Sequence, residues 1–423
     1  MTDYILHIAK LLEQGKPVIF YTVGSGTFGY IRELKNRFGK GPTAVCDGDT
    51  RKQGKTFRGL DGIQVISPQE AMEHFSNCYF FICSLDYRYQ IIGYLTESCG
   101  IASERIINYV PVKKVRSCSF LQKALVYDQT GDLRFCWRNP SPKVSASENV
   151  DATALLTLRN TLLQELEHPQ TQTQTLCDGC PQICEEYYPE SPLSWSLNYF
   201  CYSRCNYKCS YCTLRDREDG DFHNGEQPLG TLIETFKDVG LMGPDYSIIL
   251  STAGEPSIHP KRKEFYDAFD GAELVVNTNG FVFDTDLYAA MQTKKVLLVC
   301  SVDAGTAETY AKIKAVDGLA QVQKNLTHYA QSTTGIVALK YIFVPGTNDT
   351  PADIDGFVDL CINTAALFVI VSIDYFSIGN VSQKTRNMIH RLSQGLSRHH
   401  ILCVPYTAWE TAEYNSMMRE LLQ

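Results

Sequence analysis

The segment "CNYKCSYC" (residues 205–212) places three cysteines within eight positions, with Tyr211 directly before the last of them. It follows the stretch 193–200, whose apolar and aromatic residues are typical of a β-strand, so the thiols are expected in a loop at the end of that strand. Three thiolates can bind three irons of a four-iron cluster and leave the fourth iron open for another ligand. A structural zinc site would require a fourth ligand, from Cys201 or a distant histidine.

From residue 191 onward the sequence alternates between apolar strands and helical patterns. After the first strand, further strands are expected at 246–252, 273–277, 296–302, 337–344 and 367–373. Helical patterns fill the gaps near 230–240, 262–270, 284–292, 306–330 and 352–365. Six β-α units in series predict a parallel, curved sheet with ligands at the carboxyl ends of its strands.

The three-cysteine loop and four later segments resemble the radical S-adenosylmethionine (radical SAM) superfamily. The shared pattern is Cys-x3-Cys-x2-Cys with an aromatic residue before the last cysteine, after the first strand of a β-α series. The later segments agree in order and position, and they are "STAGEPSIHP" (251–260), "VVNTNG" (275–280), "CSVDAGTAETYAKIKA" (300–315) and "KYIFVPGTNDTPADIDGF" (340–357). The resemblance covers about residues 191–380 and implies a partial (β/α)6 radical SAM barrel, followed by C-terminal helices.

The resemblance implies a [4Fe–4S] cluster held by the three thiols of the loop, Cys205, Cys209 and Cys212. S-adenosylmethionine would chelate the open iron, and reductive cleavage would give a 5′-deoxyadenosyl radical that abstracts hydrogen from a substrate. The resemblance also implies a set of cofactor-binding residues: Tyr211, Gly254, Glu255, Pro256, Asn277, Asn279, Ser301, Asp303 and Val344. Alternatively, Asn277 and Asn279 could close a turn at a strand end, and Glu255 could cap the next helix.

Some of these residues have specific roles under the resemblance. The glycine–glutamate–proline motif at 254–256 would bind the methionyl amino group, and Ala253 stands where many members have glycine. By the alternation of side chains along a strand, Ser301 and Asp303 are expected on one face, pointing into the barrel near the ribose. The turn at 344–346 would lie near the adenine.

A second group of cysteines lies upstream of the barrel. Cys118 and Cys136 flank "FLQKALVYDQTGDLRF", which predicts a β-hairpin with its turn at 128–131, and Cys177 and Cys180 form a Cys-x2-Cys pair. This pattern resembles the SPASM and twitch modules of the superfamily, which normally follow the barrel. The resemblance implies an auxiliary [4Fe–4S] cluster with four protein ligands, suited to electron transfer because it has no open iron.

Two further cysteines in this region, Cys184 and Cys201, could substitute for one ligand or serve a third cluster. A zinc knuckle built from Cys177, Cys180, Cys184 and Cys201 is an alternative, and so are reduced thiols without metal. The chain has 16 cysteines, and a disulfide framework is not expected in a compartment that keeps thiols reduced.

The segment "PVIFYTVGSGTFGYIRELKNRF" (17–38) predicts a strand, a glycine-rich turn and a helix. Gly24, Gly26 and Gly29 would allow a phosphate close to the helix N-terminus, and Asp47, after a second strand, could hold a ribose hydroxyl. Further strands up to about residue 112 predict a Rossmann-like parallel-sheet domain that binds a nucleotide or nucleotide-sugar. A degenerate version of the fold, kept for packing or partner contact, is the alternative.

The composition supports a globular protein of two or three domains: 423 residues, 44% hydrophobic and 20% charged. The expected domains are 1–112 (Rossmann-like), 113–190 (a small cysteine-rich hairpin and helix module) and 191–423 (the barrel). A net charge of −8 argues against a nucleic-acid partner. No apolar run approaches the roughly 18–20 residues that cross a bilayer, so no membrane partner is expected and a cytoplasmic location is predicted.

These features predict a radical SAM enzyme that acts on a small polar substrate, such as a sugar or a nucleotide-activated sugar. The auxiliary cluster would aid an oxidation or rearrangement, and a flavodoxin or ferredoxin type protein would donate electrons. The alternative function is a maturase that modifies a ribosomally made peptide or protein. The sequence identifies no side chain as a substrate acid or base.

Overall fold

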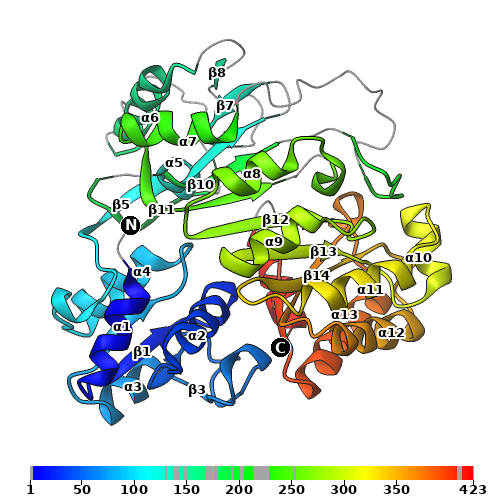
Figure 1. The fold of residues 1–423 in the computed structure, drawn as a ribbon, viewed down its shortest axis with the longest axis horizontal. Coiled ribbons are helices and arrows are strands. Elements are labelled where there is room, and N and C mark those ends of the chain that lie inside the picture. The colour runs from blue at the N-terminus through cyan, green and yellow to red at the C-terminus, as the bar shows by residue number, and fades with distance from the viewer. Residues whose placement is uncertain are drawn as a thin grey trace.

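The computed structural model describes most of the chain. The described residues are 3–128, 131–136, 143–145, 150–167, 177, 180, 182–191, 194–200, 204–212, 228–250, 254–406 and 412–422. They form a four-stranded sheet, a ten-stranded sheet and a two-stranded antiparallel ribbon, with helices packed around them (Figure 1). Because all pairs of the four-stranded sheet and most pairs of the ten-stranded sheet are parallel, the predicted α/β class is confirmed.

The N-terminal sheet has the strand order β3-β2-β1-β4. Its central strand, β1, consists of apolar and aromatic residues that are all buried, as expected for a strand covered on both faces. The elements of this part are α1 (Tyr4–Glu13), β1 (Val18–Tyr21), α2 (Ser25–Phe38), β2 (Ala44–Cys46), β3 (Val65–Ile66), α3 (Pro68–His74), β4 (Tyr79–Ile82) and α4 (Arg88–Gly93).

The middle of the chain forms a ribbon, a hairpin and one long helix. Strand β5 pairs antiparallel with β9, and β6 pairs antiparallel with β7. The predicted hairpin turn is present, because the Gly131 N–H donates to the Asp128 carbonyl (3.0 Å) and Gly131 has a φ of +78°. The elements are β5 (Val112–Cys118), α5 (Ser119–Lys123), β6 (Ala124–Tyr127), β7 (Asp132–Arg134), β8 (Lys143–Ser145), α6 (Ala152–Glu167) and β9 (Ile183–Pro189).

The large sheet has the strand order β16-β15-β14-β13-β12-β11-β10-β6-β7-β8. Strands β10 to β16 are all parallel to their neighbours, and β6 is parallel to β10 and antiparallel to β7. The elements from β10 onward are β10 (Ser194–Tyr199), α7 (Leu229–Asp238), β11 (Met242–Leu250), α8 (Arg262–Ala268), β12 (Glu273–Thr278), α9 (Thr285–Thr293), β13 (Val296–Ser301), α10 (Ala307–Lys314), α11 (Leu319–Tyr329), β14 (Ile336–Phe343), α12 (Pro351–Asn363), β15 (Phe368–Ile373), α13 (Gln383–Arg398), β16 (Leu402–Pro405) and α14 (Ala412–Leu421).

The six strands expected from the sequence correspond to β10 through β15. The sheet is wider than a six-stranded one, because β16 extends one edge and β6, β7 and β8 extend the other. Strand β6 pairs in parallel with β10, from Ala124 opposite Ser196 to Tyr127 opposite Tyr199. The hairpin expected within 113–190 is therefore part of the same sheet as the strands that follow it.

The two faces of the large sheet are covered differently. Along β13, Leu298 and Cys300 belong to a core shared with helices α7 to α13, whereas Leu297 and Val299 belong to a core shared with the N-terminal part of the chain. We call this second face the inner face. Helix α2 lies against it, with the rings of Phe28 and Phe368 6.3 Å apart (Figure 1).

Candidate functional site

The loop after β10 brings the three predicted cluster ligands to the carboxyl edge of the large sheet. Desolvation, with smaller contributions from Glu255, Cys209 and Cys212, raises the pKa of the Cys205 thiol to about 11. Desolvation and the charges of Asp303 and Cys212 raise the pKa of Cys209, while Lys314 opposes the shift. These thiols therefore lie within electrostatic reach of one another, and a bound cation would be needed to keep them as thiolates.

The donor set fits an iron–sulfur cluster in its chemistry, because one short loop carries three thiols and N–H groups lie near the sulfur of Cys205. The Tyr207 N–H lies 3.4 Å from the Cys205 sulfur, and the Asn279 side-chain amide lies 3.9 Å from it. Within the described part of the chain, no three Cys, His, Asp or Glu side chains are already gathered as a metal-ion site. The ligand assignment accordingly stays a prediction.

Helix α10 holds this loop at three points. The Tyr207 and Tyr310 hydroxyls lie 3.0 Å apart, and the Ser210 N–H donates to the Ile313 carbonyl (2.8 Å). The Tyr211 hydroxyl, at the third point, accepts a hydrogen bond from Lys314 (2.9 Å). The loop residues make these contacts in the same order as their partners along α10, so the helix holds the loop from Tyr207 to Tyr211.

Asp303 has a different position from the one expected. Alternation predicts it on the same face as Ser301, but β13 ends at Ser301 and Asp303 has a φ of +61°, which breaks the alternation. Its carboxylate is fully buried, forms an ion pair with Lys314 and accepts hydrogen bonds from the Tyr211 hydroxyl (2.6 Å) and the Ile342 N–H (2.7 Å). Asp303 therefore orients the cluster loop through Tyr211 and has no free oxygen directed at a ribose.

Glu255 is also buried and connects two strand ends. It caps the 3-10 turn η4 (Pro256–Ile258) by accepting from the Ser257 N–H (3.1 Å), as the alternative interpretation expected. It also accepts from the Thr278 hydroxyl and the Asn279 N–H, both at 2.7 Å, and its own N–H donates to the Arg204 carbonyl. Burial raises the pKa of this carboxyl. The motif at 254–256 thus joins the end of β12 to the cluster loop.

Asn279 closes a turn, as the alternative interpretation expected, and also contacts the cluster loop. Its side-chain carbonyl accepts from the Phe281 N–H (3.0 Å), which closes the turn after β12. Its amide donates to the Asn206 carbonyl (2.7 Å), inside the cluster loop. Val344 lies in another such turn, where its N–H donates to the Asn348 side chain (2.8 Å).

The inner face of the sheet becomes polar at its carboxyl edge. Asn277 and Ser301 lie on this face by alternation with Val275, Leu297 and Val299. The same alternation places Lys340 and Ser372 there, with Lys340 directly opposite Ser301 in the register. Lys340 and Ser372 were not predicted from the sequence. Each follows an apolar inner-face residue, Ala338 or Ile370, by two positions, and this spacing places its side chain on the same face. These polar side chains lie at the edge to which the cluster loop belongs.

The upstream cysteines also come together. Burial, with smaller contributions from Cys180 and Cys136, raises the pKa of Cys118 to about 11. Cys177 is one turn away from Cys180, whose N–H donates to the Cys177 carbonyl (3.0 Å). Cys118 thus lies within electrostatic reach of Cys180 and Cys136, and Cys177 is tied to Cys180 through the backbone, while no three of these side chains are gathered as a metal-ion site among the described residues.

Cys184 lies on the other side of the β5–β9 ribbon. It is opposite Ser117, whereas Cys118 is opposite Ile183, and neighbouring residues of a strand point to opposite faces. The Cys184 sulfur lies 3.8 Å from the Tyr188 hydroxyl. This geometry disfavours Cys184 as a ligand beside Cys118. Cys201 lies outside the described residues.

The predicted nucleotide-binding residues sit at the carboxyl edge of the N-terminal sheet. A Cβ atom at Gly26 would lie 2.1 Å from the Cys83 carbonyl, so only glycine fits there, and a Cβ at Gly29 would touch Ile336. Gly24 directly precedes α2. The Asp47 carboxylate accepts from the Val23 N–H (2.7 Å), Lys52 (2.9 Å) and the Asp49 N–H (2.8 Å). It thus stabilises the glycine-rich turn, and both oxygens are occupied by the protein itself.

A comparison with protein families matches the part of the chain that contains this site. Residues 199–361 match the model of the Radical SAM superfamily. The match supports a radical SAM superfamily domain within the chain and an enzyme, and the family implies a [4Fe–4S] cluster and S-adenosylmethionine as cofactors. A comparison with curated proteins found no match. No helix in the described ranges is long and apolar enough to span a membrane.

Solved structures similar to this chain include Streptococcus suis SuiB bound to S-adenosylmethionine (15% identity, 54% of this chain and 53% of that chain, TM-score 0.42). SuiB bound to its precursor peptide SuiA is also similar (12% identity, 73% and 75%, TM-score 0.42). A radical SAM methyltransferase from Sphaerobacter thermophilus is a third example (15% identity, 61% and 84%, TM-score 0.38). The chain spans about half the length of the first of these. At these sequence identities and TM-scores, no substrate or activity can be assigned to this chain from the similar structures.

Proposed function

We propose that the protein reductively cleaves S-adenosylmethionine and uses the resulting radical to oxidise or rearrange a small polar substrate. Cys205, Cys209 and Cys212 would hold the [4Fe–4S] cluster, and the family domain at 199–361 supports this assignment. When bound, the cluster and S-adenosylmethionine supply an electron and a 5′-deoxyadenosyl radical that removes hydrogen from a substrate. A flavodoxin or ferredoxin type protein is the proposed electron donor.

The observation that carries the proposal is the anchoring of the three-cysteine loop at the carboxyl edge of the parallel sheet. Tyr211 fixes the loop to the buried Asp303–Lys314 pair, and Asn279 contacts it from the end of β12. Ligands of parallel α/β sheets bind at this edge. The chain's own residues thus position the loop and shield one side of it from water.

The polar residues of the inner face support a small polar substrate. Asn277, Ser301, Lys340 and Ser372 bring amide, hydroxyl and ammonium groups to the same edge of the sheet as the cluster loop. An ammonium group with neighbouring hydroxyls suits a polyhydroxylated or anionic molecule, so a sugar or a nucleotide-activated sugar is the proposed substrate class.

We also propose an auxiliary [4Fe–4S] cluster held by Cys118, Cys136, Cys177 and Cys180. Its support is the mutual proximity of these cysteines and the placement of β6, which continues the sheet beside β10. With four protein ligands, such a cluster would accept or pass on an electron during an oxidation.

A maturase of ribosomal peptides is the second candidate function. Tyr375 and Phe376 in the turn η5 (Tyr375–Ser377), which follows β15, are 73% and 72% exposed. Exposed aromatic side chains at the edge that carries the cluster loop would favour contact with a larger partner. The two candidates differ in which deuterated molecule, a sugar or a peptide, transfers deuterium to 5′-deoxyadenosine.

An anaerobic assay tests the central proposal. The reconstituted and reduced chain is expected to form 5′-deoxyadenosine, and Cys209→Ala is expected to abolish it. Cys99→Ala is the matched control, because Cys99 is a partly buried cysteine outside both sets. Deuterated sugars and nucleotide sugars are then screened for transfer of deuterium into 5′-deoxyadenosine. Absence of 5′-deoxyadenosine from the iron-loaded wild type would contradict the proposal.

The iron content tests the auxiliary cluster separately. Two [4Fe–4S] clusters correspond to about eight irons per chain, and Cys118→Ala is expected to lower this to about four. Because Cys205, Cys209 and Cys212 remain in this variant, its first-cluster absorbance and its binding of S-adenosylmethionine are expected to persist. A wild-type chain that holds only about four irons after reconstitution would remove the auxiliary cluster from the proposal.

A further inference from the structure

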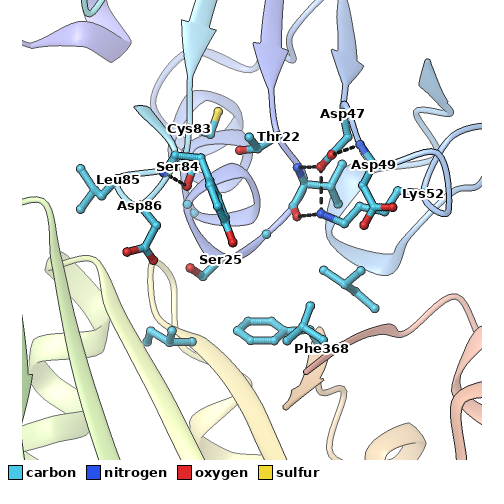
Figure 2. Close-up of a pocket in the computed structure, with 18 of the residues that line it drawn as sticks. Thr22, Ser25, Asp47, Asp49, Lys52, Cys83, Ser84, Leu85, Asp86 and Phe368 are labelled. Carbon is cyan, nitrogen blue, oxygen red and sulfur yellow. Dashed lines mark hydrogen bonds and ion pairs between the residues drawn. The ribbon is translucent and has the colours of Figure 1, made fainter. Parts of the chain in front are cut away.

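A large cavity lies between the N-terminal part of the chain and the inner face of the ten-stranded sheet. Its volume is about 1130 Å³, slightly above the roughly 300–1,000 Å³ of most small-molecule sites. Figure 2 shows Asp86 on one side of the cavity and Asp47 and Lys52 on the other. On the Asp86 side the cavity is lined by a set of polar residues that we call the polar end: Gln90, Trp195, Ser196, Ser247 and Glu273.

A row of side chains at the polar end crosses the amino ends of three strands. Ser196 of β10 lies opposite Ser247 of β11, which lies opposite Glu273 of β12, and all three line the cavity. The register of β10 and β11 shifts between Ser194 and Ser196, and such a bulge re-aims a side chain, so Trp195 lines the cavity as well. One wall therefore offers a ligand two hydroxyls, a carboxyl group and an indole N–H.

Glu273 forms no ion pair within the described part of the chain. The Ser25 hydroxyl bonds to it, and Asp86 and Lys295 are the charged groups that influence it. Lys295 is already paired with Glu33 (2.9 Å). A carboxyl group that faces a cavity without a cation partner suits a ligand that supplies the positive charge.

Two buried polar groups of the polar end lack a hydrogen-bond partner among the described residues. The Gln90 side-chain amide donates to Glu186 (3.0 Å), and its carbonyl oxygen is left as an unpaired acceptor. Trp195 is 6% exposed, and its indole N–H is an unpaired donor. Lys123 pairs with Asp86 (2.9 Å) and lies over the Trp195 ring (5.2 Å), which places Trp195 on the Asp86 side. Each unpaired buried group costs free energy that a ligand would recover.

These groups define the chemistry of the ligand. Glu273 and the Gln90 carbonyl accept hydrogen bonds, and an ammonium group donates three and accepts none. The Trp195 N–H requires an acceptor, so the same ligand must also carry oxygen atoms, and the two serine hydroxyls can bond to further hydroxyls. Tyr87 follows Asp86, lines the cavity and is 57% exposed, so it adds an aromatic face. An amino sugar combines an ammonium group with hydroxyls in this way.

The cavity continues toward the carboxyl edge that carries the cluster loop. Ile370 and Val404 line it, and Ile370 is the register partner of Lys340, one of the polar inner-face residues at that edge. Glu273 and Asn277 lie on the same face, four residues apart along β12, which corresponds to about 13 Å. A ligand anchored at Glu273 and long enough to span this distance would present its other end to the radical.

We propose that the substrate of the radical reaction is an amino sugar of more than one ring, whose ammonium group binds at the polar end of this cavity. The ammonium would pair with Glu273 and donate to the Gln90 carbonyl, while a hydroxyl would accept from the Trp195 N–H. The inference rests on the proposed function for the identity of this ligand as the substrate. Binding of the ammonium group is independent of cluster chemistry.

Isothermal titration of the full chain without reductant tests the ammonium site. The β-1,4-linked disaccharide of glucosamine and cellobiose are matched probes, because they differ only in carrying ammonium groups or hydroxyls at the same ring carbons. The amino disaccharide is expected to bind at one site per chain, about tenfold more tightly than cellobiose, because a charge-assisted hydrogen bond is stronger than a neutral one.

Three variants identify the groups responsible. Glu273→Gln should weaken the amino disaccharide by about tenfold and leave cellobiose nearly unchanged, since glutamine fills the same space without the charge. Trp195→Phe should weaken both sugars by about fivefold, because it removes the N–H and keeps an aromatic ring. Glu264→Gln, at an exposed position outside the cavity, is the matched control and should change neither affinity.

The reduced, iron-loaded enzyme connects this site to the radical reaction. The amino disaccharide, deuterated at its ring carbons, is expected to pass deuterium to 5′-deoxyadenosine. A wild-type chain that does not prefer the amino disaccharide over cellobiose, or a preference that Glu273→Gln leaves unchanged, would overturn the ammonium site. Binding without deuterium transfer, in a chain that forms 5′-deoxyadenosine, would overturn the assignment as substrate. A chain that forms no 5′-deoxyadenosine contradicts the proposed function, whereas the titration decides the ammonium site without the cluster.

Discussion

The substitution Lys314→Met is expected to destabilise the protein and loosen the cluster loop. The Lys314 and Asp303 side chains are 1% and 0% exposed and form an ion pair. Burial disfavours the ammonium ion, but the Asp303 carboxylate outweighs this and raises the pKa of Lys314. Methionine keeps the apolar stem and removes the charge, so the carboxylate would stay buried with only the Tyr211 hydroxyl and the Ile342 N–H as donors.

The expected loss is about 3 kcal/mol in the free energy of unfolding. Removing one partner of a buried ion pair costs about 3–5 kcal/mol, and two remaining hydrogen bonds to the carboxylate favour the lower value. Lys263→Met is the matched control, because Lys263 and Asp267 form an ion pair whose side chains are 65% and 63% exposed. The control should lose less than about 1 kcal/mol.

Urea unfolding of the metal-free chain, followed by circular dichroism, measures this loss. The double variant Asp303→Asn with Lys314→Met should recover part of it, because no uncompensated charge stays buried. Iron retention after reconstitution should fall in Lys314→Met, since Tyr211 loses a partner that fixes the loop. A Lys314→Met chain as stable as the Lys263→Met control, or a double variant less stable than Lys314→Met alone, would refute the reasoning.

Two further predictions concern the N-terminal part and the cavity. Gly26→Ala should lower the free energy of unfolding by about 2 kcal/mol or more, because its Cβ would lie 2.1 Å from the Cys83 carbonyl; Gly41→Ala, with no atom within 4 Å, should be nearly neutral in the same urea titration. Burial, with a contribution from Asp86, raises the pKa of Glu273 to about 7, while Ser25 and Lys295 oppose the shift. The contribution of protonated Glu273 to the free energy of unfolding is therefore complete below about pH 4.5 and is lost as the pH rises through about 7. Glu273→Gln should be more stable than wild type at pH 8, by up to about 3 kcal/mol, and as stable as wild type near pH 4.5. Equal stability of the two chains at pH 8 would contradict this.

Much of the architecture was predictable because its signals are local. The alternation of apolar strands and helical patterns locates β10 to β15, and the aspartate-to-glycine turn locates the β6–β7 hairpin. The position of "CNYKCSYC" after a strand places the cluster loop at the carboxyl edge, since every parallel strand of the series ends at that edge.

Long-range contacts were not predictable from such signals. The pairing of β6 with β10 joins segments about 70 residues apart, and nothing in either strand specifies the other as its neighbour. Asp303 and Asp47 have the residue type and spacing of ligand-binding acids, yet each is satisfied by protein donors. The positive φ of Asp303 depends on its tertiary partners, because its own residue type permits several backbone conformations.

The placement of the N-terminal part has a consequence for the packing of the large sheet. It covers the apolar inner face, where Leu297, Ile336 and Phe368 pack against α2 and its neighbours. Those side chains would face water if that part were absent, so the N-terminal part contributes to the core of the catalytic sheet.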